Sequence, residues 1–252
     1  MFGRPATTGL EGYRYGTMAN RRTWYRRFAK LFAAPAYYMY ECGQLRSILR
    51  ARAVDRYGRA LPMFTYPAIE FLYAIEPALA DADVLEFGCG QSTLWFAPRV
   101  RSLLGVEPYE DFRSALQRQF EDDPRIRFID ATMPFDIQGR FDIAVLDGNP
   151  RVAAGKFIPT VLRDDGIIIF DNSDFQSLWE VPAHLHELGF ARVDFFGYSP
   201  TGVRKQGTSI FFKSLKWFRT DALVRPVSAN SLTWEEDPRR PVRRADGVRL
   251  SD

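Results

Sequence analysis

The sequence has little of several things that mark special classes of protein. Among 252 residues there are two cysteines, Cys42 and Cys89, and two histidines. Two cysteines cannot form a disulfide framework, and they suit a chain that works in the reducing cytoplasm, which is where we expect this one. No apolar run approaches the roughly 18 residues that a membrane-spanning helix needs. The first residues lack a charged start followed by an apolar stretch, so we expect no secretory leader.

Positive charge is unevenly distributed along the chain. Residues 1–60 carry 12 Lys/Arg against 3 Asp/Glu, whereas the remainder carries 22 against 28. The net charge of +3 therefore describes an arginine-rich front segment on a mildly acidic body. A hydrophobic content of 46% suits a globular core and excludes a wholly disordered chain.

Hydrophobic periodicity divides the chain into three parts. We expect a basic, mostly helical extension over 1–60, a main domain over 61–215, and a charged, proline-broken and flexible tail over 216–252. In the main domain, apolar strands alternate with helices, which predicts an α/β fold with a mostly parallel sheet and helices on both faces. The last two strands, 191–198 and 207–214, follow each other without a helix. We expect them to form an antiparallel pair.

The extension contains one clear amphipathic pattern. Apolar side chains recur at helical spacing over 21–34, with arginines mostly off that stripe, and Pro35 is expected to end or kink this helix. A second helix is expected over 37–53. The basic helix could pack on the body, cover a substrate pocket, form a homodimer contact, or make a peripheral contact with an anionic membrane through 21–34. The acidic body and the lack of a nucleic-acid motif speak against a nucleic-acid partner.

A glycine-rich turn, EFGCGQST, follows the first strand of the main domain. Gly88 and Gly90 let the backbone turn tightly and approach a ligand closely, and Ser92 or Thr93 can cap the next helix. Glu107 ends the next strand, where an acid can accept hydrogen bonds from ribose hydroxyls. The third glycine of the dinucleotide fingerprint is missing, and no GxxxxGK[ST] loop occurs. Both points favour a nucleoside ligand without a pyrophosphate over NAD or ATP.

These pieces together resemble the class I S-adenosylmethionine-dependent methyltransferases. VLEFGCGQSTLWFA looks like their first motif, and the chain is similar in particular to a bacterial set with TYPAIEFL, E-x-GxG-x-ST, VDG and DNS motifs. The resemblance covers about residues 61–214 and implies a Rossmann-like fold, S-adenosylmethionine as cofactor and methyltransferase activity. The further matching segments are LPMFTYPAIEFL at 61–72, VLDG at 145–148, DNSD at 171–174, GFARVDFFG at 189–197 and TSIFF at 208–212.

By position, the resemblance also implies roles for single residues. The glycine turn would border the methionine and ribose parts of the cofactor, Glu107 would hold the ribose hydroxyls, and Asp130 would lie near the adenine amine. Asp147 would face the transferred methyl group and the acceptor. Tyr66 could reach the cofactor pocket, or it could be a core or entrance aromatic. The expected cofactor-binding set is Tyr66, Glu86, Gly88, Gly90, Ser92, Thr93, Glu107, Asp130 and Asp147.

A metal is a further option. Asp147, Asp171 and Asn172 resemble the set that holds Mg²⁺ in catechol-type O-methyltransferases, and three oxygen ligands suit a hard cation that lowers the pKa of an acceptor hydroxyl. Arg151 stands in the region where those enzymes carry a lysine base, and arginine is a poor base. It could instead bind an acidic group of the substrate. Asp171 and Asn172 could also cap a helix or line the pocket without metal.

The sequence therefore predicts a methyltransferase acting on a small-molecule or glycoconjugate acceptor, with O-methylation favoured and Asp147 and Arg151 as catalytic candidates. Other readings stay open. One is a Rossmann-like binding or assembly module without catalysis. RNA methylation and aminopropyl transfer rank lower.

Overall fold

The computed structural model describes residues 21–218. The expectations about 1–20 and most of the C-terminal tail lie outside this range. The chain divides after Met39 into two compact units, and the whole candidate site belongs to the second. In the described part, no helix has the length and apolar character needed to cross a bilayer.

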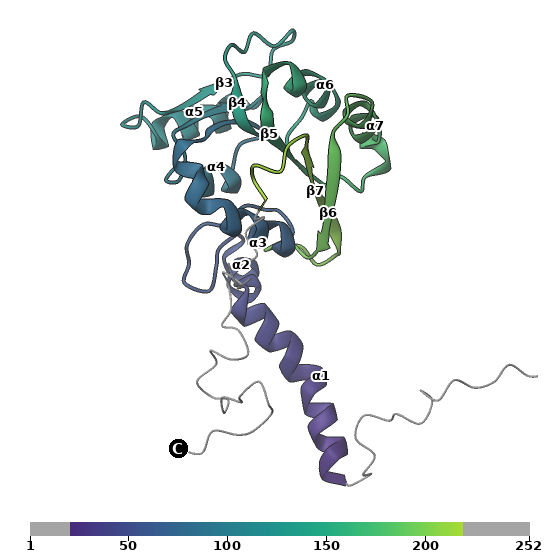
Figure 1. Cartoon of the computed structure of the whole chain (residues 1–252). Coiled ribbons are helices and arrows are strands. Elements are labelled where there is room, and N and C mark those ends of the chain that lie inside the picture. Colours follow the sequence, from purple (N-terminus) through teal and green to yellow (C-terminus); the bar gives the residue numbers. More distant parts are fainter. Residues whose placement is uncertain (1–20, 219–252) are drawn as a thin grey trace, which may run out of the picture. The chain divides into compact units, whose positions relative to one another are not determined.

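The front segment folds differently from the prediction of two long helices. Helix α1 (Arg21–Glu41, purple in Figure 1) continues through Pro35 instead of ending there. Because proline has no N–H, this continuation costs the helix one backbone hydrogen bond. The break comes at Gly43, whose φ of +83° is the left-handed conformation that glycine tolerates, and where a Cβ would collide with the backbone of Asp55. The second helix, α2 (Gln44–Arg50), is therefore short.

A seven-stranded sheet forms the centre of the second unit (Figure 1). The strand order is β3-β2-β1-β4-β5-β7-β6. Neighbours are parallel except that β7 runs antiparallel to both β5 and β6. This arrangement confirms the predicted Rossmann-like, mostly parallel sheet with an antiparallel C-terminal strand. The strands are β1 (Asp83–Phe87), β2 (Ser102–Val106), β3 (Ile126–Ile129), β4 (Phe141–Leu146), β5 (Leu162–Asp171), β6 (Ala191–Gly197) and β7 (Gln206–Phe212).

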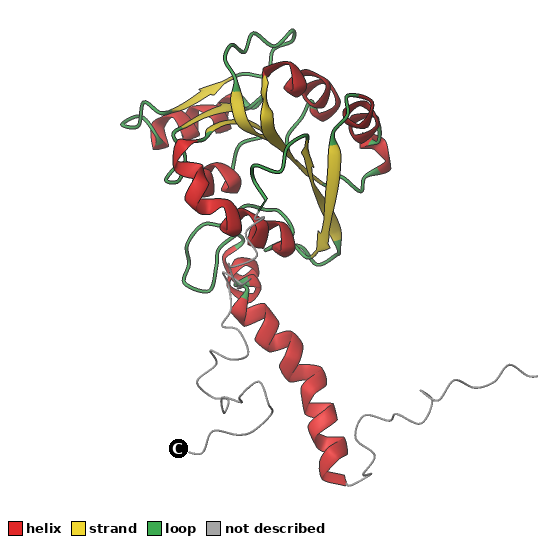
Figure 2. Cartoon of the chain, in the orientation of Figure 1, coloured by secondary structure: helices red, strands yellow, loops and turns green. Residues whose placement is uncertain are grey.

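Helices cover both faces of this sheet (Figure 2). One face packs against buried side chains such as Leu72, Trp95 and Leu116, and the other against side chains such as Ile158 and Leu185. Since both faces are covered, all six residues of β4 are buried, and all of them except Asp142 are apolar. The first face carries α3 (Tyr66–Ile75), η1 (Glu76–Asp81), α4 (Gln91–Phe96) and α5 (Glu110–Gln119); the second carries α6 (Arg151–Val161), η2 (Gln176–Leu178) and α7 (Glu180–Glu187).

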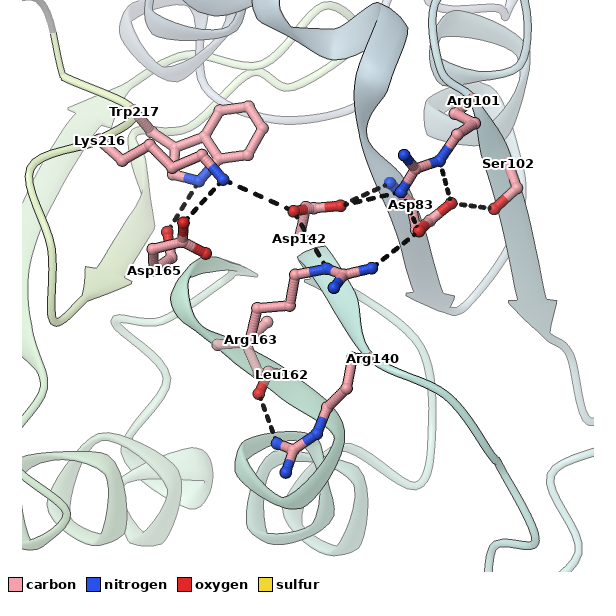
Figure 3. A network of polar contacts seen from close by, with 10 residues as sticks. All are labelled: Asp83, Arg101, Ser102, Arg140, Asp142, Leu162, Arg163, Asp165, Lys216 and Trp217. Atoms are coloured by element: carbon pink, nitrogen blue, oxygen red, sulfur yellow. Dashed lines mark hydrogen bonds and ion pairs between the residues drawn. The ribbon is translucent and has the colours of Figure 1, made fainter.

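A polar network ties the sheet together at the edge where β1 and β4 begin (Figure 3). The carboxylate of Asp142 accepts a hydrogen bond from the backbone N–H of Asp83 at 2.9 Å. It also pairs with Arg163 at 3.3 Å and Lys216 at 3.7 Å. The guanidinium of Arg101 beside Asp83 lowers the pKa of that carboxyl to about 2. This edge is opposite the glycine turn, so the network is structural.

The same network holds the residues that follow β7. Trp217 is buried, and its ring N–H donates to the carbonyl of Asp165 at 2.9 Å. Its ring belongs to the core on the α3 side of the sheet. The first residues of the expected tail therefore pack on the main domain.

Candidate functional site

The carboxyl ends of the parallel strands meet at one edge of the sheet. Phe87 of β1 is in register with Val106 of β2 and Leu146 of β4, and Leu146 with Phe170 of β5. Ligands of open α/β sheets bind outside this edge. Because β7 is antiparallel, its first residues also lie there. The residues brought to this edge are Gly88, Glu107, Asp147, Asp171 and Thr208.

Gly88 joins the loops that follow β1 and β4. Its φ is +87°, and a Cβ at this position would collide with the backbone of Gly148. The carbonyl of Phe87 accepts hydrogen bonds from the N–H groups of Asp147 at 2.9 Å and Gly148 at 2.7 Å. The turn predicted from sequence thus needs glycine for a contact with a second loop 60 residues away as well as for its backbone angle.

Gly90 is different, because no neighbour fills the space beside it. A Cβ built there meets no described atom within 4 Å. Its N–H donates to the hydroxyl of Thr93 at 2.8 Å, which closes the turn into α4. The turn therefore presents an open backbone surface on which a ligand can rest.

Glu86 is joined to this turn through the hydroxyl of Thr93 and is fully buried. Its Oε2 accepts a hydrogen bond from the hydroxyl of Thr93 at 2.5 Å, whereas Oε1 has no hydrogen-bond partner among the described residues. Burial raises the pKa of Glu86 to about 8, against the lowering effect of hydrogen bonds from Ser92 and Thr93, with a further rise from the charge of Asp147. The site thus holds a buried carboxyl that lacks a compensating cation.

Glu107 is buried at the end of β2, as predicted, and is held by backbone donors. One carboxylate oxygen accepts from the N–H of Cys89 at 3.2 Å and the other from the N–H of Tyr109 at 3.0 Å. A carboxylate has about four lone-pair sites, so capacity remains for ligand hydroxyls.

Two further predicted cofactor residues, Asp130 and Tyr66, differ in their exposure. Asp130 is exposed after β3, where its carboxylate accepts from the N–H of Thr132 at 2.9 Å and hydrogen bonding lowers its pKa. Tyr66 is buried at the start of α3, and its backbone N–H donates to the carbonyl of Tyr198 at 2.9 Å. Its hydroxyl lies at the thiol of Cys42.

Arg151 lies between the residues that were candidates for a metal. Its guanidinium donates to Oδ1 of Asp147 at 2.9 Å and to Oδ1 of Asn172 at 2.9 Å. It also bonds the backbone carbonyl of Asp147. Asn172 takes a left-handed φ of +52°, which asparagine tolerates better than most residues. The cation at the centre of this set is the chain's own guanidinium.

Asp171 is held from β7. Its Oδ1 accepts from the hydroxyl of Thr208 at 2.6 Å and its Oδ2 from the amide of Gln206 at 3.4 Å. Burial, followed by the charge of Asp147, raises the pKa of Asp171 to about 7. Burial also raises the pKa of Asp147, against the effect of Arg151. The two carboxyls therefore hold a proton more tightly than exposed aspartates do.

The oxygen atoms of this set do not fit a magnesium ion. The guanidinium of Arg151 already bonds one oxygen of Asp147 and the amide oxygen of Asn172, and its positive charge would repel a second cation between them. Residues 21–218 also contain no group of three or more His, Cys, Asp or Glu side chains arranged to hold a metal. The structure gives the magnesium expectation no support.

Sequence reasoning missed two threonines, Thr65 and Thr208, that connect to Asp171 through hydrogen bonds. The hydroxyl of Thr208 also accepts the N–H of Thr65 at 3.1 Å, which links the start of α3 to Asp171. Both threonines lie in segments that the sequence analysis singled out, TYPAIEFL and TSIFF, but no role was assigned to either. Contacts across 143 residues leave no local signal in a sequence.

A cavity of about 540 Å³ lies beside this site. It is lined by Arg151 and Lys156 of α6 and by apolar groups from Pro150, Val152 and Leu178. Lys156 pairs with Glu180 at 2.8 Å. A molecule bound there would contact Arg151, which bonds Asp147.

Comparisons with known proteins concern the fold. No protein-family model and no curated protein sequence matches the chain. Among solved structures, a methyltransferase from Pyrococcus furiosus is 16% identical with a TM-score of 0.47, covering 72% of this chain and 98% of its own. A precorrin 8W decarboxylase from Methanobacterium thermoautotrophicum is 16% identical with a TM-score of 0.47, covering 64% and 96%. The N-methyltransferase NodS from Bradyrhizobium japonicum is 17% identical with a TM-score of 0.43, covering 58% and 96%. The strand order of the sheet, rather than these distant likenesses, establishes the fold as a Rossmann-like α/β sheet.

Proposed function

We propose that this chain is an S-adenosylmethionine-dependent methyltransferase. The observation that carries the proposal is the buried Glu86, which has one unbonded carboxyl oxygen and is joined through the hydroxyl of Thr93 to the N–H of Gly90. In the empty site, burial keeps this carboxyl protonated up to a pKa of about 8. A cationic ligand next to it would stabilise the ionised form.

The charge of the whole edge supports a cationic nucleoside. Four carboxyls, those of Glu86, Glu107, Asp147 and Asp171, lie at this edge together with two guanidinium groups. Arg151 pairs with Asp147, whereas Arg113 bonds the backbone carbonyl of Glu107 and pairs with Glu110 outside the set. A pyrophosphate would be repelled there, whereas a ligand with a sulfonium and an ammonium group would be attracted. Bound S-adenosylmethionine supplies an electrophilic methyl group on its sulfonium sulfur. The glycine turn and Glu86 would hold its methionine part, and Glu107 would accept from its ribose hydroxyls.

The chain's own residues then position an acceptor and take its proton. The cavity beside α6 would bind a small-molecule or glycoconjugate acceptor against Arg151, which bonds Asp147. Asp171 is buried and Asp147 is half-buried, and a carboxylate with a raised pKa is a better base for a hydroxyl proton. Thr208 fixes the direction of Asp171, and Arg151 fixes that of Asp147. Alignment of the acceptor oxygen with the methyl group would supply most of the rate enhancement. No metal is needed for this arrangement.

Calorimetric titration with S-adenosylhomocysteine tests the cofactor site. We expect a Kd on the order of micromolar. Gly90→Arg should fold normally, since the side chain enters open space, but should lower the affinity at least about 100-fold because it fills the ligand surface. Gly90→Ala is the matched control and should retain most of the binding.

Two results would overturn the proposal. One is the absence of binding by a folded wild-type chain, which would favour a binding module without catalysis. The other is a Gly90→Arg variant that binds as well as wild type, which would place the ligand elsewhere.

A further inference from the structure

Helix α1 presents an apolar face to solvent. Phe28, Leu31 and Phe32 lie at i, i+3 and i+4 and share one side of the helix, with Pro35 following at i+7. They are 47%, 68% and 65% exposed, respectively. The rings of Phe28 and Phe32 contact each other edge to face, with centroids 5.2 Å apart. Three large exposed apolar side chains on one face form a surface that water solvates poorly. We call these three residues the α1 apolar face.

The same helix is basic over all but its last residue, Glu41. Between residues 21 and 40 the sequence carries five Arg/Lys and no Asp/Glu. Arg27 and Lys30 are exposed and precede Leu31 by four residues and by one, so they flank the α1 apolar face. Long basic side chains can keep their charge in water while their stems lie against an apolar layer. Further aromatic residues follow towards the end of the helix, where Tyr37, Tyr38 and Tyr40 are exposed.

We propose that α1 binds the surface of a membrane containing anionic lipids, with the α1 apolar face inserted at the level of the headgroups. A helix that combines an apolar face with an excess of basic residues is suited to this position. Anionic headgroups supply the opposite charge for its arginines and lysines. Tyrosine is enriched at the same depth of a bilayer.

A second copy of the chain and a nucleic acid are two other candidates to cover the α1 apolar face, and both fit it less well. A second copy of α1 would bring five more positive charges against the first five, and Glu41, the acidic residue at the end of the helix, is already paired with Arg56. Nucleic acid would match the charge, but it offers an aliphatic side chain such as Leu31 no apolar layer. The bilayer alone satisfies both the charge and the apolar side chains.

Vesicle flotation of the full chain tests this proposal. We expect at least about tenfold stronger binding to vesicles of phosphatidylcholine mixed with phosphatidylglycerol than to phosphatidylcholine alone, with loss of that preference at high salt. Phe28→Ser/Phe32→Ser should lower binding at least about tenfold. Arg27→Glu/Lys30→Glu should remove the preference for anionic vesicles. Val203→Ser, at an exposed apolar residue of the main domain, is the matched control and should bind as wild type.

Equal binding to both kinds of vesicle, or no binding by the wild-type chain, would overturn the proposal. So would a Phe28→Ser/Phe32→Ser variant that floats as wild type does. Sedimentation velocity gives a further check: a wild-type dimer that this variant converts to monomer, without vesicle binding, would assign the face to a second copy. Retention of RNA without vesicle binding would assign it to nucleic acid.

Discussion

Replacing Glu86 by glutamine should make the protein more stable at alkaline pH while weakening cofactor binding. Burial raises the pKa of this carboxyl from 4.5 to about 8. The folded state therefore holds a proton that the unfolded state releases between these two values. Its contribution to stability is fully present below pH 4.5 and is lost as the pH rises through about 8. Glutamine has no such dependence.

The size of the expected stability difference follows from the pKa of Glu86 in the unfolded and folded states. The interval from 4.5 to about 8 corresponds to about 5 kcal/mol of unfavourable free energy for the ionised form. The amide hydrogens of glutamine would themselves lack partners beside the unbonded oxygen, which offsets about 1–3 kcal/mol of that gain at every pH. We therefore expect the variant to unfold with a free energy about 2–4 kcal/mol higher than wild type at pH 8.5, with the advantage gone at pH 5.

Urea denaturation followed by circular dichroism at the two pH values measures this difference. Glu121→Gln, at an exposed turn position, is the matched control and should follow wild type at both pH values. The reasoning is refuted if Glu86→Gln differs from wild type by the same amount at pH 5 and pH 8.5. The cofactor site would then hold an ordinary carboxyl.

Further predictions concern the neighbouring groups. Gly88→Ala should lower the free energy of unfolding by at least about 2 kcal/mol in urea denaturation, because it combines a positive φ with a collision at Gly148. Asp142→Ala should destabilise by about 2–3 kcal/mol in the same assay, since it leaves several cations at the opposite edge without their buried partner. With an acceptor in hand, the rate should rise with pH through about 7 as Asp171 ionises, and Asp171→Asn should flatten that profile. Chelation of divalent cations should leave the rate unchanged, because the guanidinium of Arg151 bonds the candidate metal ligands; a rate restored only by Mg²⁺ would contradict this.

Much of the fold could be predicted from sequence because its signals are local. The apolar run GIIIF identifies a strand covered on both faces, and the alternation with helices identifies a parallel sheet. The ends of the helices in the front segment could not be predicted as well. Helix α1 passes Pro35, and Gly43 ends it for a reason that lies in the backbone of Asp55. That contact depends on chain folding and leaves no mark beside the glycine.

In the candidate site too, sequence reasoning could name some residues but could not predict their contacts. The positions of Glu86 and Glu107 follow from strand ends, so sequence reasoning could name them. The lack of a hydrogen-bond partner for one carboxyl oxygen of Glu86 could not be predicted, since it depends on which donors the packed core supplies. The bond from Arg151 to Asn172 spans 21 residues across two strand ends, and this bond argues against a metal there. Such contacts require the three-dimensional register of the sheet.

A crystal structure of the chain grown with S-adenosylhomocysteine tests the central claim most directly. The account predicts density at the carboxyl edge, with the ribose hydroxyls within hydrogen-bond distance of Glu107 and the amino acid part over Gly88 and Gly90. Density confined to another cavity, such as the one beside α7 lined by Trp179 and Phe190, would contradict it. A saturated crystal without ligand density at the glycine turn would contradict it equally.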